Sequence, residues 1–193
     1  MDDNEQFITL VKLSRAGDHE AYGEIYEKTV QDVYRTVRFL VRHASDAEDL
    51  VQEVYIQAYR SLEKFDAQRP FRPWLMGIAM RIVQNDRRKK LLRLRFNERV
   101  NKTDTAMEQD FTGELVSKLA HRPLLEQVQR LPYKQRQVIT LHYLSEYTQE
   151  EIATILDIPL GTVKSRIHAG LGKLRQKKRI LQFIEGRKVE DWG

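Results

Sequence analysis

Acidic and amide side chains recur at helical spacing in the segment after His43. Asp46, Asp49 and Glu53 are three and four residues apart and Gln52 lies beside them, so a helix would place all four close together. Such a group has three possible uses: a surface for a basic partner, a solvated face with favourable charges near a helix N-terminus, or a metal or nuclease site. No histidine lies beside these acids at metal-ligand spacing, which argues against the third use.

Other catalytic or cofactor-binding patterns are missing from the sequence. It contains no cysteine, no Gly-rich phosphate loop and no nucleophile motif. The five histidines are scattered, as His19, His43, His121, His142 and His168. We therefore expect no metal, no cofactor and no catalytic residue, and a protein that is not an enzyme.

Aromatic and basic residues are interleaved between residues 64 and 95. Exposed bases of single-stranded DNA stack on aromatic rings while cations contact the phosphates, so this composition favours such a ligand. An alternative for Phe71 and Trp74 is that they anchor a helix in the core, and we prefer this alternative for Trp74. The alternative for the basic run at 87–90 is a solvated basic turn, but there we prefer contact with DNA phosphates. The predicted DNA-contacting residues are Lys64, Phe65, Arg69, Phe71, Arg72, Arg81, Gln84, Asn85, Arg87, Arg88 and Lys89.

Two short helical segments near the C-terminus are separated by a tight break. Thr148 and Glu151 have the spacing of a capping box, and a short apolar face follows them. Residues 157–159 would end this helix, and the next would run to about Arg175. Two helices so joined are typical of a helix-turn-helix.

The last of these helices has a polar outward side framed by cations. Small side chains and His168 would approach base edges in a major groove, while Lys and Arg side chains contact phosphates. The alternative is a solvated basic helix, but residues 160–179 hold seven Lys or Arg and no acid, which favours DNA. The predicted contacts are Thr162, Lys164, Ser165, Arg166, His168, Ala169 and Lys173.

The elements that must position these residues are all predicted to be helical, because apolar residues recur at helical spacing and few stretches alternate with period two. A first helix would cover residues 5–16 and end at Gly17, and Asp18 would cap a second. A third, separate apolar stripe would cover residues 30–40. Ser45 and Glu48 would form the capping box of the next helix, followed by a loop at 63–73.

The fold class is therefore all-α, with two small helical domains joined by a linker. From about residue 87 to residue 119 a basic run gives way to polar residues with little helical period. We predict a first domain over residues 1–90, a linker over 91–120, a helix-turn-helix domain over 121–179 and a C-terminal tail over 180–193.

Composition limits the compartment and the partners. The chain has 193 residues, 33 Lys or Arg against 28 Asp or Glu, and a formal net charge of +5. Residues 44–66 hold six acids and two bases, so the acidic and basic regions are separate and suit different partners. Without cysteine, a long apolar run or an apolar start, we expect neither a membrane span nor a secretory signal, and place the protein in the cytoplasm.

The C-terminal half resembles region four of bacterial sigma factors. The resemblance covers residues 148–175, which include the sequence TQEEIA and the sequence GTVKSR, and the upstream Leu131, Pro132, Gln135, Arg136 and Val138. This half is also similar to the DNA-binding end of a response regulator. Such a regulator would need alternating strands in its other half, and the N-terminal half lacks them.

The N-terminal half resembles region two of the same family. Residues 46–53 match the region-two signature, and Phe71, Trp74, Leu75, Ile78 and Ala79 match the segment after it. Both motifs occur in the expected order, and a single linker replaces the additional domains of housekeeping sigma factors. The chain is thus identified as a member of the small extracytoplasmic-function (ECF, group 4) subgroup of the sigma-70 family.

The resemblance implies a promoter-recognition subunit of RNA polymerase with no catalytic activity of its own. Asp46, Asp49, Gln52 and Glu53 would contact the polymerase clamp. The loop and helix between Lys64 and Lys89 would hold the opened minus-10 element, with a flipped base in the loop, and the last helix would bind duplex minus-35 DNA. The implied partners are core RNA polymerase (clamp and flap), promoter DNA and an anti-sigma factor, with no small-molecule substrate.

The promoter sequence does not follow from the resemblance. Arg81 and Asn85 stand where many members carry Asn and Asp, and Ala169 and Leu171 stand where Arg is frequent. The alternative function is a stand-alone helix-turn-helix transcriptional regulator, which would bind a palindromic duplex without polymerase.

Overall fold

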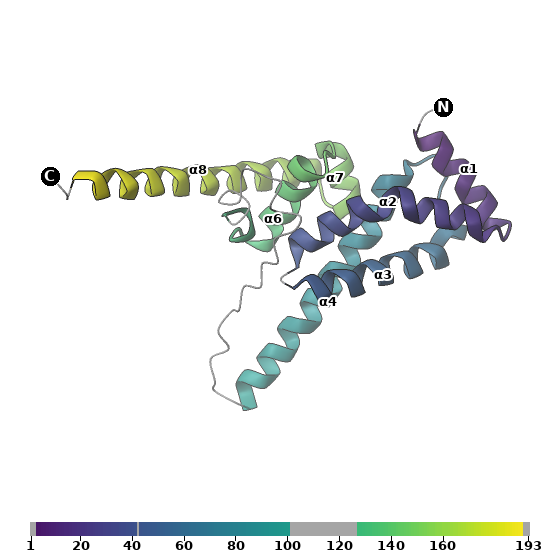
Figure 1. Ribbon diagram of the computed structural model, residues 1–193, viewed down its shortest axis with the longest axis horizontal. Helices are drawn as coiled ribbons and strands as arrows, with labels where there is room; N and C mark the ends of the chain where they lie inside the picture. Colours follow the sequence, from purple (N-terminus) through teal and green to yellow (C-terminus); the bar gives the residue numbers. More distant parts are fainter. Residues whose placement is uncertain (1–2, 42, 101–126, 191–193) are drawn as a thin grey trace. The chain divides into compact units, whose positions relative to one another are not determined.

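The computed structural model describes the backbone of residues 3–41, 43–100 and 127–190, and the side chains in these ranges except 95–100 and 177–190. Every regular element in this part of the chain is a helix, which confirms the all-α prediction (Figure 1). Contacts group residues 1–112 and 154–157 into one compact unit and residues 113–153 and 158–193 into another. None of the described helices is both long and apolar enough to cross a membrane.

Two helices at the N-terminus are separated by a glycine. Helix α1 (Asp3–Arg15) is followed by Gly17, whose φ of 95° lies in the region that favours glycine. Asp18 then accepts hydrogen bonds from the backbone N–H groups of Glu20 and Ala21, which confirms it as the N-cap of α2 (His19–Leu40).

The prediction of separate helices before and after residue 30 is wrong, because α2 is continuous to Leu40. Its buried residues include Ile25, Thr29 and Val33, four residues apart, so the stripe passes through a polar residue without a break. Burial of Thr29 is possible because its hydroxyl donates to the carbonyl oxygen of Ile25 and shares a 2.7 Å hydrogen bond with the Tyr55 hydroxyl.

The next helix, α3 (Ala44–Ser61), does not begin as predicted. His43 occupies the N-cap position, and no side chain caps the helix. Ser45 lies inside the first turn instead of the flanking position from which a capping side chain acts, so the predicted Ser45–Glu48 capping box is wrong. The short 3-10 helix η1 (Leu62–Lys64) follows directly.

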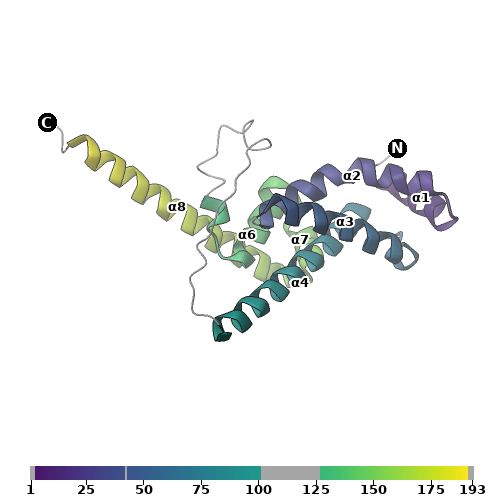
Figure 2. The ribbon, with the colours of Figure 1, turned by 60° about the horizontal axis from the view of Figure 1, so that its bottom comes forward.

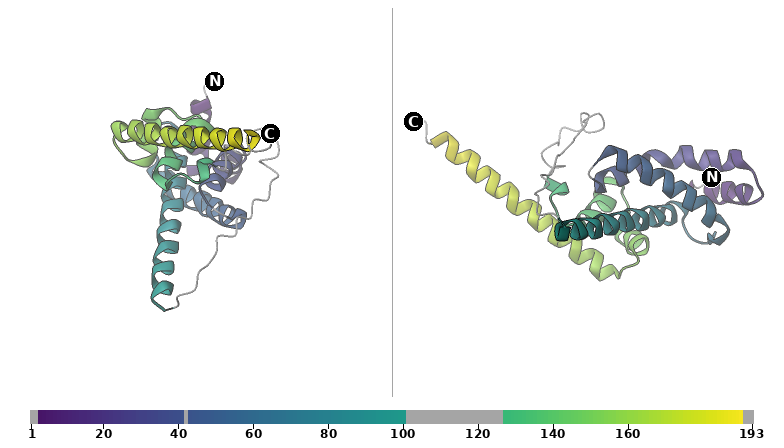
Figure 3. Two further views of the ribbon diagram at one scale, coloured as in Figure 1. Left: turned by 90° about the vertical axis from the view of Figure 1, so that its left-hand side faces the viewer. Right: turned by 90° about the horizontal axis from the view of Figure 1, so that it is seen from below.

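Helix α4 (Phe71–Val100) packs its first half into the core and extends its second half beyond α1, α2 and α3 (Figure 3). Residues 91–100, predicted as the start of the linker, are helical and continue α4. Leu, Arg and Lys favour a helix even without an apolar stripe, and Asp86 and Lys90 pair across one turn. Most of the predicted linker, residues 101–120, lies outside the described residues.

The second unit carries the C-terminal helices α6 (Tyr133–Ile139), the π-helix η2 (Thr140–Leu144), the first part of α7 (Gln149–Leu156) and α8 (Leu160–Glu190). Helix α8 does not end near Arg175 as predicted, and its last turns extend beyond α6 (Figure 2). The backbone of residues 180–190, predicted as a tail, is therefore a continuation of this helix.

Candidate functional site

The acidic surface, defined here as Asp46, Asp49, Gln52 and Glu53, lies on the first half of α3. Asp49, Gln52 and Glu53 are exposed, while Val51 and Val54, on the other side of the helix, are buried. The buried stripe thus fixes which way the polar side chains face. The structure brings the predicted residues together on one exposed face of α3.

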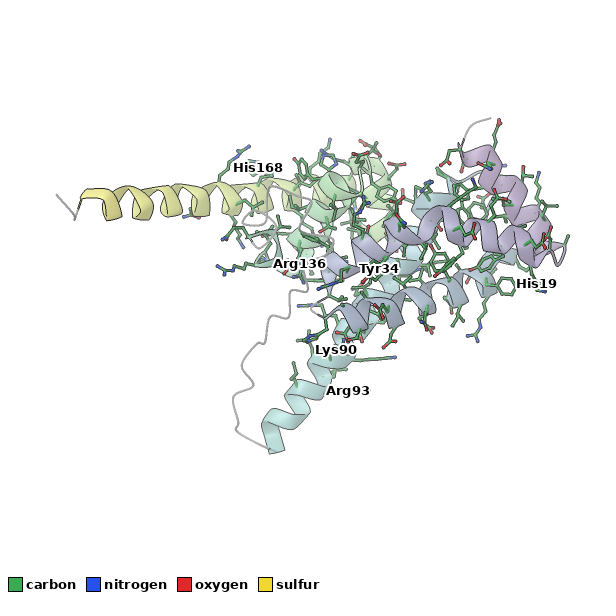
Figure 4. The ribbon with its side chains drawn as sticks, in the orientation of Figure 1. His19, Tyr34, Lys90, Arg93, Arg136 and His168 are labelled. Carbon is green, nitrogen blue, oxygen red and sulfur yellow. The ribbon has the colours of Figure 1, made fainter. Side chains whose placement is uncertain are left out.

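Asp46 differs from the other three residues because it is paired within the protein. The ammonium of Lys90 on α4 lies 2.8 Å from the carboxylate of Asp46 and 3.0 Å from that of Asp86 (Figure 4). Burial alone would lower the pKa of Lys90, but hydrogen bonds and attraction from the two carboxylates raise it above its usual value. Lys90 therefore stays charged and ties the start of α3 to the middle of α4.

Sequence analysis missed two apolar members of the same region. Ile56 and Tyr59 continue the exposed face at three- and four-residue spacing after Gln52 and Glu53, and their side chains are 47% and 42% exposed. The Tyr59 ring makes an edge contact with Tyr22 at 4.8 Å, which holds its position. The spacing could have identified Ile56, because it falls outside the buried stripe of its helix. Exposed apolar side chains beside charges are typical of protein-binding surfaces.

The predicted aromatic contacts to DNA are corrected by the structure. Phe65 and Phe71 are only 4% and 0% exposed, so neither ring presents a face to a base. They contact each other at 5.5 Å and Trp74 at 4.9 and 5.4 Å. These rings anchor the start of α4 in the core, which agrees with the core position preferred for Trp74.

Arg72 is also engaged within the protein. Its guanidinium donates to the carboxylates of Asp3 at 2.8 Å and Asp32 at 3.1 Å, and it lies over the Phe7 ring. Its predicted contact with DNA would compete with these pairs.

The other predicted residues of this region remain exposed. We call them the basic surface. Lys64 lies on η1 and Arg69 on the loop after it, and the members on α4 are Arg81, Gln84, Asn85, Arg87, Arg88 and Lys89. Most of them lie where α4 passes out of the core, so the surface is a row of cations and amides along one long helix. A rod of positive charge suits a phosphate backbone.

The helix-turn-helix is formed by local hydrogen bonds. The Thr148 backbone N–H donates to the Glu151 carboxylate at 2.8 Å, and the Glu151 N–H donates to the Thr148 hydroxyl at 3.2 Å, so the predicted capping box is confirmed. Asp157, with φ of 51°, ends α7 in the left-handed conformation. Pro159 then accepts from the N–H groups of Thr162 and Val163 and begins α8.

The first turns of α8 separate a buried side from an exposed one. Val163, Ile167 and Gly170 are buried, while Lys164, Ser165, His168 and Lys173 are exposed. Thr162, Arg166 and Ala169 are half-buried at the edge of the exposed side. We call the seven predicted residues the recognition face; helical spacing places them outside the stripe formed by the buried residues. Figure 4 labels His168, one of its members.

Gly170 sets the distance between α8 and α6. A Cβ atom there would lie 3.1 Å from the Ile139 side chain, whereas at Gly172 it would meet nothing within 4 Å. The absent side chain lets the two helices approach closely, and this approach supports the recognition face from behind.

No group of acidic, His or Cys side chains in the described ranges could hold a metal ion. The candidate site therefore consists of three surfaces: the acidic surface of α3 with Ile56 and Tyr59, the basic surface mainly on α4, and the recognition face of α8. Each suits binding of a macromolecule.

Comparison with known proteins shows which family has this arrangement. The family model for sigma-70 region 2 matches residues 25–91, and that for sigma-70 region 4 matches residues 121–174. The chain is 32% identical over 179 residues to the ECF RNA polymerase sigma factor SigW of Bacillus subtilis, a match that covers 89% of this chain and 96% of SigW. The chain belongs to the ECF sigma factors of the sigma-70 family. Sigma factors are transcription initiation factors, not enzymes.

Other comparisons agree with this membership. The ECF sigma factor SigL of Mycobacterium tuberculosis is 32% identical over 154 residues, which cover 78% of this ECF factor and 85% of SigL. Two solved structures share its fold. CnrH, solved with the cytosolic domain of CnrY, has a TM-score of 0.66 at 20% identity, and the match covers 91% of this chain and 98% of the CnrH chain. RpoE of Bartonella quintana, solved with the anti-sigma factor NepR, has a TM-score of 0.64 at 21% identity, and the match covers 81% of this chain and 98% of the RpoE chain.

Replacing Gly170 by valine should destabilise the second unit of this ECF factor. The added side chain must displace Ile139, so we expect a loss of about 1–3 kcal/mol in the free energy of unfolding, measured by urea titration with circular dichroism. The control is Gly172→Val, which should change stability by less than about 0.5 kcal/mol because the site is open. Equal effects of the two substitutions would contradict the close approach of α6 and α8.

Proposed function

We propose that this ECF sigma factor docks on the clamp of core RNA polymerase through the acidic surface of α3. The observation that carries the proposal is the joint exposure of Asp49, Gln52 and Glu53 on a helix whose opposite side is buried. A basic coiled coil, such as that of the clamp, complements these charges. Asp46 contributes indirectly, because Lys90 already neutralises it.

The apolar residues that continue this face support protein binding over mere solvation. Ile56 and Tyr59 are large side chains that lose contact with water only when a partner covers them. Acidic side chains around an apolar centre would steer a basic partner and then bury the centre, which is the usual arrangement of an interface. A solvated helix face would not need either side chain.

The basic surface is proposed to hold the opened minus-10 element. Its cations are exposed along α4 and suit the phosphates of a single strand. Since Phe65 and Phe71 are buried, a flipped base would meet the exposed loop residues 66–70 instead of these rings. Arg69 belongs to this loop and pairs with Asp66 at 3.6 Å.

The recognition face of α8 is proposed to bind duplex minus-35 DNA in the major groove. Ser165 and His168 would contact base edges, while Lys164, Arg166 and Lys173 would contact phosphates. The second unit, carrying region 4, would also contact the polymerase flap. The stand-alone regulator is the less favoured alternative, because it leaves the acidic surface without a role.

Three further assignments belong to the same proposal. The chain would belong to group 4 of the sigma-70 family and act in the cytoplasm, where its polymerase is. Its domains would cover residues 1–90 and 121–179, although α4 and α8 run on past residues 90 and 179. An anti-sigma factor is proposed as its regulator, because the similar factor RpoE was solved with the anti-sigma factor NepR. Such a partner would cover the acidic surface.

Changing Gln52 and Glu53 together to alanine should weaken binding to core RNA polymerase by about tenfold or more, because interface centres carry residues worth ~2 kcal/mol each. The measurement is the fluorescence anisotropy of labelled protein titrated with core enzyme. The matched control, Glu27→Ala with Gln31→Ala, alters an exposed acid and amide on α2 at four-residue spacing. An unchanged affinity for the first variant would remove the acidic surface from the docking proposal.

Two substitutions on α8 should affect minus-35 binding in different ways. Lys173→Met should reduce the slope of log affinity against log salt concentration by about one, because one phosphate contact is lost. His168→Ala should leave the slope unchanged but lower discrimination between minus-35 variants by about 1–3 kcal/mol. The measurement is holoenzyme binding to duplex fragments over a range of salt. Identical effects of both variants on slope and discrimination would contradict these roles.

A further inference from the structure

Helix α1 fastens both ends of the loop between η1 and α4. The family match for sigma-70 region 2 begins at residue 25, so α1 lies before it. Yet residues at both ends of α1 bind the chain on either side of residues 66–70.

At the first end of the loop, Arg15 binds two backbone carbonyls. Its Nε donates to the carbonyl oxygen of Leu62 at 2.9 Å, and its Nη2 donates to that of Phe65 at 2.6 Å. Leu62 is the C-cap residue of α3 and Phe65 is that of η1, so both carbonyls lie where a helix ends. The Leu62 carbonyl oxygen also accepts from the Phe65 N–H at 3.0 Å. A charged guanidinium bound to both sets the direction in which the chain leaves η1.

At the second end of the loop, Asn4 binds the first residue of α4. Its side-chain oxygen accepts from the Phe71 N–H at 3.0 Å. The first N–H groups of an α-helix have no partner within that helix, so Asn4 supplies an acceptor for this one from another helix. Asp3 adds a 2.8 Å ion pair to Arg72 in the same turn.

Aromatic stacking joins these two attachments. The Phe7 ring of α1 stacks on Phe71 with centroids 5.0 Å apart and planes inclined by 15°. Phe71 in turn meets Phe65, and all three rings are buried. Phe65 and Phe71, which border the loop, are therefore linked to α1 through buried ring contacts.

Between the two attachments, residues 66–70 are all exposed but not irregular. The Asp66 carboxylate accepts from the Gln68 N–H at 3.0 Å, and its carbonyl oxygen accepts from the Arg69 N–H at 2.9 Å. The loop is a turn begun by Asp66, with its polar side chains facing solvent.

We propose that α1 presets this loop for capture of the minus-10 base, with Arg15 and Asn4 as positioning residues. The inference rests on the proposed function, in which the loop receives a flipped base from the opened strand. A loop already held in shape loses less conformational entropy when the base enters, so more of the contact energy remains to keep the DNA open. Without α1, the same loop residues would have to be ordered by the DNA.

The test uses holoenzyme reconstituted with full-length variants and one promoter fragment that the wild-type protein transcribes. Arg15→Met removes both carbonyl contacts and Asn4→Leu removes the acceptor, while Asn4→Asp keeps an acceptor oxygen. Lys12→Met is the control, an exposed cation elsewhere on α1. Run-off transcription is measured on the duplex fragment and on the same fragment with noncomplementary bases in the minus-10 element. Core affinity and thermal melting are measured for every variant.

Arg15→Met should lower duplex transcription about tenfold, as expected when hydrogen bonds from a charged donor are lost. Asn4→Leu should lower it about threefold, within the range for one neutral hydrogen bond. Both losses should shrink on the premelted fragment, core affinity should stay within about twofold, and Asn4→Asp and Lys12→Met should behave like wild type. If Arg15→Met fails to fold, the pair Asn4→Leu and Asn4→Asp decides alone.

Three results would overturn the proposal. Wild-type activity in both Arg15→Met and Asn4→Leu would show that the loop needs no preset shape. Equal losses on duplex and premelted DNA together with weaker core binding would show that α1 only supports the fold. No transcript with the wild-type protein would instead overturn the proposed function, and this inference with it.

Discussion

The burial of a small group of aromatic rings at the start of α4 is the constraint on which the N-terminal unit depends. Phe71 is fully buried between Phe7 and Phe65, with Trp74 against its side. Ring stacking fixes the direction of α4, and α4 in turn carries most of the basic surface out of the core. Because the same rings border residues 66–70, the core and the loop proposed to hold the minus-10 base share one set of contacts. A substitution that shrinks one ring would therefore disturb the stability of the core and the shape of this loop together.

Separation of charge makes the three surfaces suited to different partners. Acidic side chains gather on α3, while cations line α4 and α8, so a basic protein and a nucleic acid can bind without competing for one face. Lys90 links the acidic side chains of α3 to the cations of α4, because its ammonium forms ion pairs with Asp46 of α3 and Asp86 of α4. This contact holds the acidic surface in a fixed relation to the basic surface. A fixed relation is what a protein needs when it must hold a partner and a DNA strand at the same time.

The helical period predicted most of the fold, because burial of one stripe decides where a helix lies. N-caps were predictable where a capping side chain directly follows a break in the helical pattern, as at Asp18 and Thr148. The cap predicted at Ser45 was wrong because α3 already begins at Ala44, one residue before it. The exposed members of the site followed from residue type and spacing. Burial of Phe65 and Phe71 did not, because a ring suits a core and a base equally well until its neighbours are known. The contacts of α1 with the loop join residues far apart in the chain, and no local pattern reveals them.

The most direct test of the central claim, that this chain directs promoter-specific initiation, is run-off transcription by purified core RNA polymerase on a library of genomic promoter fragments from the same organism. We predict that a subset of fragments yields new transcripts only when the protein is present. Absence of such transcripts, together with tight binding of the free protein to a palindromic duplex, would contradict the account and favour a stand-alone regulator.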